Sequence, residues 1–96
     1  MRLAWSSRAL RDLREIFSFI SEDDPEAAAK WVKKLRTRAA AAAAAPNTGR
    51  WLPEHPDRKN LREVIFRGYR IVYALDGGRL VVLTVFEGHR QLPTHL

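Results

Sequence analysis

Residues 60–75 read NLREVIFRGYRIVYAL, and this stretch decides the fold. β-branched, aliphatic and aromatic residues dominate it, which is typical of strands. Gly68 interrupts the run, and glycine permits a sharp bend because it adopts positive φ without strain. The stretch therefore predicts two neighbouring antiparallel strands, at about 61–67 and 69–75.

Two more strands extend this pair into a sheet. The tripeptide Asp76-Gly77-Gly78 is a strong hairpin signal, and it leads into an apolar run at about 80–87. At the N-terminus, the sequence RLAW at residues 2–5 predicts a short strand. We expect one small, mostly antiparallel sheet.

The first of two predicted helices follows residues 2–5. Ser6 or Ser7 can cap it, because a serine hydroxyl accepts a hydrogen bond from the free N–H groups of the first turn. The helix should end near Glu22 or Asp23, because Pro25 disfavours a helical conformation in the residue before it. Apolar residues recur at helical spacing along one stripe: Leu10, Leu13, Ile16, Phe17 and Ile20.

The second helix begins at Asp24-Pro25-Glu26, which supplies an N-cap, a proline at the first helical position and an acid at the positive end of the helix dipole. An alanine run extends it to about Ala45. Its apolar positions are Ala28, Trp31, Val32, Leu35, Ala39 and Ala42. Residues 46–60 contain three prolines and few apolar residues, so we interpret them as an exposed connector.

The order of elements, β-α-α-β-β-β, predicts an α+β fold in which a helical hairpin packs on one face of the sheet. A chain of 96 residues forms one domain, here residues 1–96. The tail after Gly88 is short and polar, and we expect no further element there.

Composition narrows the classes of function. There is no cysteine, and the three histidines (His55, His89 and His95) lack metal-ligand spacing, so we expect no metal site and no cofactor. The sequence contains neither the apolar run of a signal peptide nor a stretch long enough to span a bilayer, so we expect a soluble, cytoplasmic protein with no membrane partner. The formal net charge of +6 favours anionic partners.

The arginines Arg62, Arg67 and Arg70 interrupt the strands and need a place in the sheet. Side chains alternate along 69–75, so its large apolar residues (Tyr69, Ile71, Tyr73 and Leu75) should face the helices. Arg70 should then lie on the uncovered face, where small neighbours leave it reachable. Alternation does not decide which way the strand at 61–67 faces. Alternatively, Arg62 and Arg70 solvate an exposed face and pair with Glu63 or Asp76.

The pattern LREV…GYRIVY…LVVLTVFEGHRQLP, after a helical hairpin and the connector GRWLPE, resembles the RelE/ParE superfamily of bacterial toxin–antitoxin toxins. The resemblance covers nearly the whole chain. It implies the same fold, a helical hairpin on a small antiparallel sheet. It also implies a protein partner, because family members are neutralised by a co-expressed antitoxin that wraps the toxin. The expected partner is a cognate antitoxin, ParD-like or similar, in a hetero-oligomer.

The superfamily implies two activities. RelE-like members cut mRNA on the ribosome, and ParE-like members act on DNA gyrase. In the resemblance, Arg70 matches the sheet arginine of the family, Arg90 matches its C-terminal arginine, and Arg62 matches one basic position. The second basic position, two residues further on, is Val64, whereas His89 lies where some ribonuclease members place a histidine.

These matches favour the gyrase inhibitor over the ribonuclease. RNA cleavage needs groups that move protons, but arginine stays protonated, Val64 has no proton chemistry, and no tyrosine follows Arg90. Arg62, Arg70, His89 and Arg90 are therefore expected to bind the target, and would be catalytic only in a ribonuclease. Ribosome-dependent cleavage of mRNA remains the alternative, and a third possibility is a non-toxic relative that only binds its partner.

The antitoxin is expected on the helical hairpin. Residues 25–45 carry five basic residues against Glu26, which suits an acidic, amphipathic partner segment. The residues expected to bind it are Leu13, Phe17, Trp31, Lys34, Leu35 and Arg38.

Overall fold

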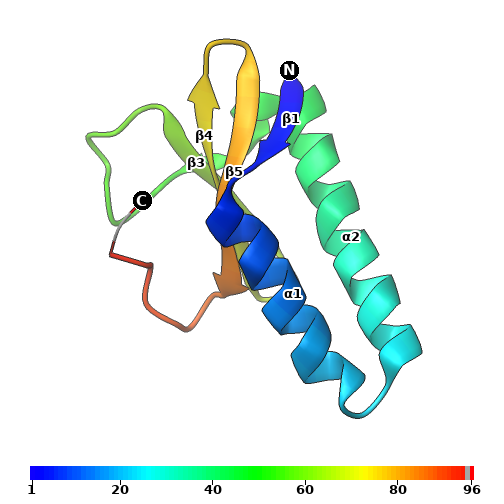
Figure 1. The fold of residues 1–96 in the computed structure, drawn as a ribbon. Helices are drawn as coiled ribbons and strands as arrows, with labels where there is room; N and C mark the ends of the chain where they lie inside the picture. The colour runs from blue at the N-terminus through cyan, green and yellow to red at the C-terminus, as the bar shows by residue number, and fades with distance from the viewer. Residues whose placement is uncertain (95) are drawn as a thin grey trace.

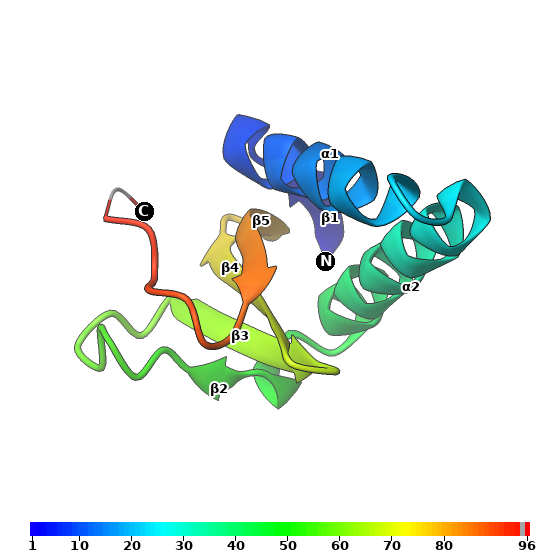
Figure 2. The same ribbon diagram turned by 90° about the horizontal axis from the view of Figure 1, so that it is seen from below.

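The computed structural model describes residues 1–94 and 96, and two helices pack on one side of a strongly twisted sheet (Figures 1 and 2). The elements are β1 (Arg2–Trp5), α1 (Ser7–Ser21), α2 (Pro25–Ala44), the 3₁₀ turn η1 (Pro46–Thr48), β2 (Arg50–Trp51), β3 (Leu61–Phe66), β4 (Tyr69–Asp76) and β5 (Arg79–Glu87). The predicted fold class is confirmed. No helix within the described chain has the length and apolar character that crossing a membrane requires.

The sheet has five strands in the order β1-β5-β4-β3-β2. β1 runs parallel to β5, and every other neighbouring pair is antiparallel. Two-residue turns join β3 to β4 and β4 to β5, and both of their residues have positive φ: 48° and 83° at Arg67 and Gly68, then 53° and 83° at Gly77 and Gly78. Such turns match the twist of the strands, so the predicted hairpins form.

The predicted caps set the start of both helices. Ser6 accepts a hydrogen bond from the Ala9 N–H at 3.0 Å, and Asp24 accepts one from the Ala27 N–H at 3.0 Å. Pro25 is the first residue of α2, as expected. These caps supply acceptors for N–H groups that have no partner within the helix.

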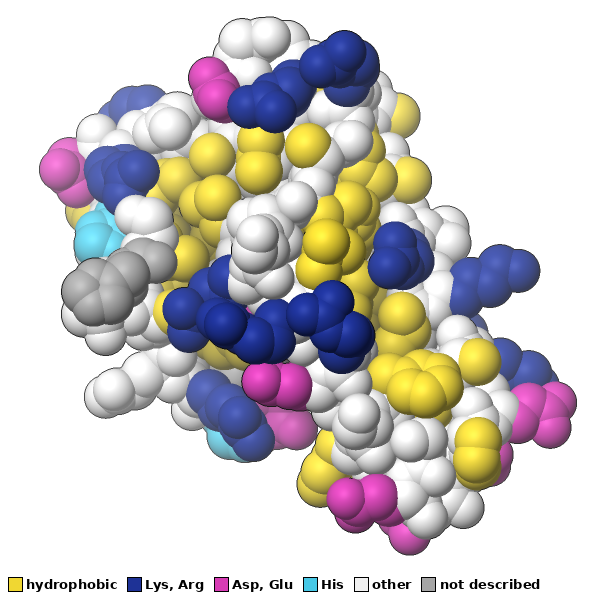
Figure 3. Space-filling view, in the orientation of Figure 1, with side chains coloured by type: hydrophobic (Ala, Val, Ile, Leu, Met, Phe, Trp, Pro, Cys, Tyr) yellow, Lys and Arg dark blue, Asp and Glu magenta, His cyan; other side chains and the backbone are white. Residues whose placement is uncertain are grey.

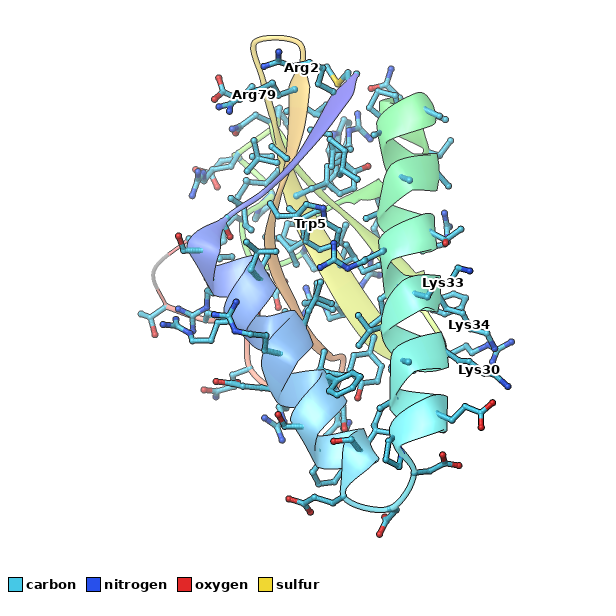
Figure 4. The ribbon with its side chains drawn as sticks, turned by 45° about the vertical axis from the view of Figure 1, so that its right-hand side comes forward. Arg2, Trp5, Lys30, Lys33, Lys34 and Arg79 are labelled. Carbon is cyan, nitrogen blue, oxygen red and sulfur yellow. The ribbon has the colours of Figure 1, made fainter. Side chains whose placement is uncertain are left out.

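The main core lies between the helices and the sheet. From β4 it takes Ile71 and Tyr73, with Tyr69 and Leu75 packed against it, so the predicted inward face of this strand is confirmed. The helices contribute apolar side chains that include Leu13 and Leu35, which are 2% and 0% exposed. In Figure 4, Trp5 lies between β1 and α2, and the guanidinium carbon of Arg36 lies 5.4 Å from the centre of its ring.

The other face of the sheet is partly covered, contrary to expectation. Leu52 is fully buried against Leu61 and Val72, and the tail residues Leu92 and Leu96 pack against this second cluster. Residues 46–60 therefore include a 3₁₀ turn, a strand and a core residue, rather than an exposed connector alone. A lone leucine among prolines has no periodicity, which is why the sequence pattern missed it.

The start of α1 covers the open edge of β5. On this edge the strand pairs with β1 only as far as Val82, whereas its other edge stays paired with β4. Ser6 Oγ then donates to the Leu83 carbonyl at 2.9 Å, and the Asp12 carboxylate accepts from the Val85 N–H at 3.0 Å and from the Thr84 hydroxyl at 2.6 Å. These contacts pair the edge groups of β5 and fix α1 beside the end of that strand.

Candidate functional site

Arg70 is buried inside an ion cluster on the sheet face away from the helices. The residue is 7% exposed, and its guanidinium donates from Nε to Glu63 at 2.6 Å. Its two terminal nitrogens donate to the two oxygens of Glu54, each at 2.7 Å. Arg50 completes this cluster, since its Nε donates to the second oxygen of Glu63 at 2.6 Å. We call these four residues the Arg70 cluster.

The cluster neutralises its own charge, with two guanidinium groups facing two carboxylates. Hydrogen bonds to Glu54 and Glu63 raise the pKa of Arg70 against the opposing effect of burial, and the bond from Arg70 is the main cause of a lowered pKa at Glu54. The expectation of a reachable Arg70 was therefore wrong. Its partner Glu54 lies in residues 46–60, which the sequence pattern predicts to be an exposed connector. Its pairing with Glu63 matches one of the expected alternatives.

Arg62 lies on the opposite face of the sheet from Arg70. It pairs across strands with Tyr73, a core residue on the helix side, and its guanidinium donates to the Gly49 carbonyl at 2.7 Å. Its neighbour at the second basic position of the family, Val64, is 5% exposed and points into the main core. The pattern at 61–67 did not decide this orientation.

His89 and Arg90 follow β5 and separate. His89 Nε2 lies 2.9 Å from a Glu87 oxygen, and the side chain borders a shallow groove that also contains Arg70, Glu54 and Ile65. Arg90 borders a different cavity, beside α1. Of the four predicted target residues, only Arg70 and His89 thus border the same cavity. His95 lies outside the described residues.

A groove runs along the outer side of α2. Its volume is about 470 Å³, and the turn between β3 and β4 forms its second wall. Five of its lining residues are cations. None of the described residues that line it is acidic. The lining consists of Lys30, Lys33, Lys34, Thr37, Arg38, Ala41, Phe66 and Arg67, which we call the α2 groove. In Figure 4, Lys30, Lys33 and Lys34 project from this side of the helix.

The six residues expected to bind an antitoxin fall into three groups. Lys34 and Arg38 line the α2 groove, and Trp31 supports it from within by stacking on Phe66 at a centroid distance of 5.5 Å. Phe17 is 39% exposed but does not line this groove. Leu13 and Leu35 are buried in the core, so a partner cannot reach their side chains on this fold.

A second cavity, which we call the α1–β5 pocket, lies where α1 passes the end of β5. It has a volume of about 290 Å³. α1 contributes Asp12, Glu15, Ile16 and Phe19; the sheet contributes Tyr69, Val85, Phe86 and Glu87; and the tail contributes Arg90. No local sequence pattern indicates this pocket, because its walls come from segments far apart in the chain.

On the face shown in Figure 3, a band of basic side chains crosses the start of α1, and acidic side chains lie directly beside it as well as at the tip of the helical hairpin. Among the residues that the structure describes, no group of three His, Cys, Asp or Glu is arranged to hold a metal ion. The site thus has two concave surfaces of different charge, the α2 groove and the α1–β5 pocket, and one ion cluster that pairs its own charges, the Arg70 cluster.

Comparison with known proteins shows which protein family the chain resembles in fold and in sequence. The fold matches a chain of the chromosomal ParDE TA system from P. aeruginosa with a TM-score of 0.75, covering 91% of this chain and 95% of that one at 20% identity. The sequence is 39% identical over 95 residues to the toxin candidate Y4kP of Sinorhizobium fredii (strain NBRC 101917 / NGR234), covering 96% of this chain and 93% of the relative. Residues 3–92 match the family described as ParE toxin of type II toxin-antitoxin system, parDE. The chain belongs to the ParE toxin family.

Proposed function

We propose that this ParE-type toxin inhibits DNA gyrase by direct binding, without catalysis, and is neutralised by a cognate antitoxin. The observation that carries the proposal is the closed Arg70 cluster. Five N–H donors make a guanidinium suitable for holding a phosphate, but three of those of Arg70 are directed at Glu54 and Glu63. Only two of its N–H groups remain for a phosphate, on a residue that is 7% exposed.

The surroundings of the cluster support a non-catalytic mode. A ribonuclease needs a base and an acid that converge on the same phosphate. Here Arg62 lies on the opposite face, and Arg90 lies beside α1. We therefore expect the target to contact His89 and Arg90 at the surface, while Arg70 holds the fold. Ribosome-dependent cleavage has one observation in its favour, the shared groove of Arg70 and His89.

The α2 groove supports an acidic, amphipathic antitoxin segment. Its cationic rim complements acids, and the ring of Phe66 and the methyl group of Ala41 offer an apolar floor. We infer that the toxin and antitoxin form a hetero-oligomer in the cytoplasm, where both proposed partners act. The double variant Lys33→Glu/Lys34→Glu should weaken antitoxin affinity at least tenfold, whereas Arg11→Glu on the exposed side of α1 should change it little. Equal losses in both variants would contradict this placement.

A paired assay tests the proposed activity. The toxin, purified and freed of antitoxin, is added to a gyrase supercoiling reaction and, separately, to translating ribosomes followed by primer extension across the message. We expect supercoiling to fall while the message stays intact. Codon-phased cuts that vanish in His89→Ala, with supercoiling unaffected, would replace the proposal with the ribonuclease. Normal growth of cells that express the soluble toxin alone would favour a non-toxic relative.

A further inference from the structure

The α1–β5 pocket is a concavity beside Arg90 that antitoxin binding in the α2 groove does not explain. We propose that this pocket is the contact point for the toxin's target, and that it receives one long side chain with a positive tip, arginine or lysine, from a basic protein segment. The inference rests on the proposed function in that it assumes a protein target. The volume of about 290 Å³ exceeds the roughly 150 Å³ of an apolar cavity that holds benzene, so there is room for one such side chain.

The walls of the pocket suit an aliphatic stem. Ile16, Val85 and Phe86 line it with apolar surface, and Phe19 stands at its rim. Phe19 is 72% exposed, the highest value among the large apolar residues described. An aromatic side chain held in water beside a cavity is typical of the residues that anchor protein–protein contacts. A partner that fills the pocket would cover this ring and bury its apolar surface.

The charges of the pocket suit a positive tip. Its lining contains three carboxylates, Asp12, Glu15 and Glu87, and one guanidinium, Arg90. This balance is negative in a chain whose net charge is +6. The α2 groove carries the opposite charge, since all the charged residues described in its lining are cations. Each surface therefore repels the segment that the other attracts, and the toxin can sort an acidic antitoxin from a basic target.

Tyr69 reports the sign of the charge inside the pocket. Burial raises the pKa of its phenol, Glu87 raises that pKa further, and Arg90 lowers it by less. The field of the carboxylate thus outweighs that of the guanidinium at the phenol. The ring makes an edge contact with Trp31 of α2 at a centroid distance of 5.6 Å, so the second helix supports this wall of the pocket.

A pair of small probes tests the chemistry of the pocket without any target. Benzamidine and benzoate share a ring and differ in the sign of their charge, and both can be titrated into the ¹⁵N-labelled toxin by NMR. We expect benzamidine to bind in the millimolar range, as suits a probe of about nine non-hydrogen atoms, and to shift the amides of Ile16, Phe19 and Tyr69. Benzoate should bind at least fivefold more weakly, and Glu15→Gln should weaken benzamidine binding severalfold. Equal or tighter binding of benzoate, or shifts that map elsewhere, would overturn the inference.

Variants of the pocket test its link to the target. Phe19→Ala and Glu15→Lys should each raise the toxin concentration needed for half-inhibition of gyrase at least tenfold. The matched controls are Trp51→Ala, another exposed aromatic residue, and Glu22→Lys, the same charge change at the C-cap of α1 and outside the pocket; neither should change inhibition by more than twofold. Retained antitoxin binding verifies that each variant is folded.

The outcomes of the two experiments are distinguishable. If the wild-type toxin inhibits gyrase and the two pocket variants inhibit it equally well, the pocket inference fails and the proposed function stands. If the toxin leaves gyrase active but benzamidine binds as expected, the proposed function fails, and probe binding still supports a pocket for a positively charged side chain.

Discussion

Substitution of Glu63 by glutamine tests whether the Arg70 cluster holds the fold. The Glu63 side chain is fully buried, and its two oxygens accept from Arg70 and from Arg50, each at 2.6 Å. Glutamine keeps the volume but replaces one acceptor oxygen by an NH₂ donor, which would face an arginine N–H. One of the two charge-assisted bonds is therefore lost, and a buried guanidinium loses part of its counter-charge.

The magnitude follows from the exposure of the two arginines. The side chain of Arg50 is 55% exposed and can turn to water, whereas that of Arg70 is 8% exposed and cannot. Breaking a buried ion pair by removing one partner costs roughly 3–5 kcal/mol. Arg70 keeps Glu54, so we expect the lower end, about 3 kcal/mol. At about 4–8 °C per kcal/mol for a domain of this size, the midpoint of thermal unfolding should fall by roughly 12–24 °C.

Urea and thermal unfolding, followed by circular dichroism, measure this change. Arg50→Gln is the control, because loss of the exposed pair should cost about 1 kcal/mol or less. Glu63→Leu/Arg70→Met should recover most of the lost stability, since an apolar pair leaves no unpaired charge in the interior. A Glu63→Gln variant that is no less stable than Arg50→Gln would refute the structural role of the cluster and leave Arg70 available for a ligand.

Three further predictions concern the fold. Gly49→Ala should cost about 1–3 kcal/mol in urea unfolding, because its Cβ would overlap the Tyr73 hydroxyl, and Tyr73→Phe in the same chain should recover part of that loss; strictly additive losses would contradict it. Asp12→Ala should cost about 1–3 kcal/mol, because it strips the acceptor from two groups of β5, and a cost equal to that of Asp12→Asn, which keeps an acceptor oxygen, would argue against this reason. Hydrogen bonds from Arg70 lower the pKa of Glu54 below its ordinary value of 4.5, so its stabilisation is complete above about pH 4.5 and lost as pH falls through the folded pKa. The unfolding midpoints of wild type and Glu54→Gln should therefore converge as pH falls below about 4.5, and a constant difference would contradict the pairing.

Local signals explain why most of the fold could be predicted from the sequence. Caps at Ser6 and Asp24 act through neighbouring residues, and the turn at Gly77 and Gly78 depends on backbone preference alone. Alternation also predicted the inward face of β4. This strand lies at the centre of the sheet, where one of its faces packs on the main core. Each of these features is determined within a few residues of sequence.

The site depends on contacts between distant residues, which no local pattern contains. Arg70 meets Glu54, 16 residues away, so its burial could not be read from the strand around it. Leu13 and Leu35 belong to apolar stripes, and the side chains of these two residues face the protein's own core, where a partner cannot reach them. The walls of the α1–β5 pocket come together across a distance in sequence, as in the bond between Asp12 on α1 and Val85 on β5, 73 residues further along the chain.

We propose that the toxin acts on gyrase as a stoichiometric binder rather than as an enzyme. Titration of the purified toxin into a fixed, higher-than-Kd concentration of gyrase, with supercoiling as the readout, tests it most directly. We expect inhibition to rise in proportion to added toxin and to saturate when the toxin binding sites of gyrase are filled. Complete inhibition at a small fraction of that ratio would show turnover, and full supercoiling at every ratio would contradict gyrase as the target.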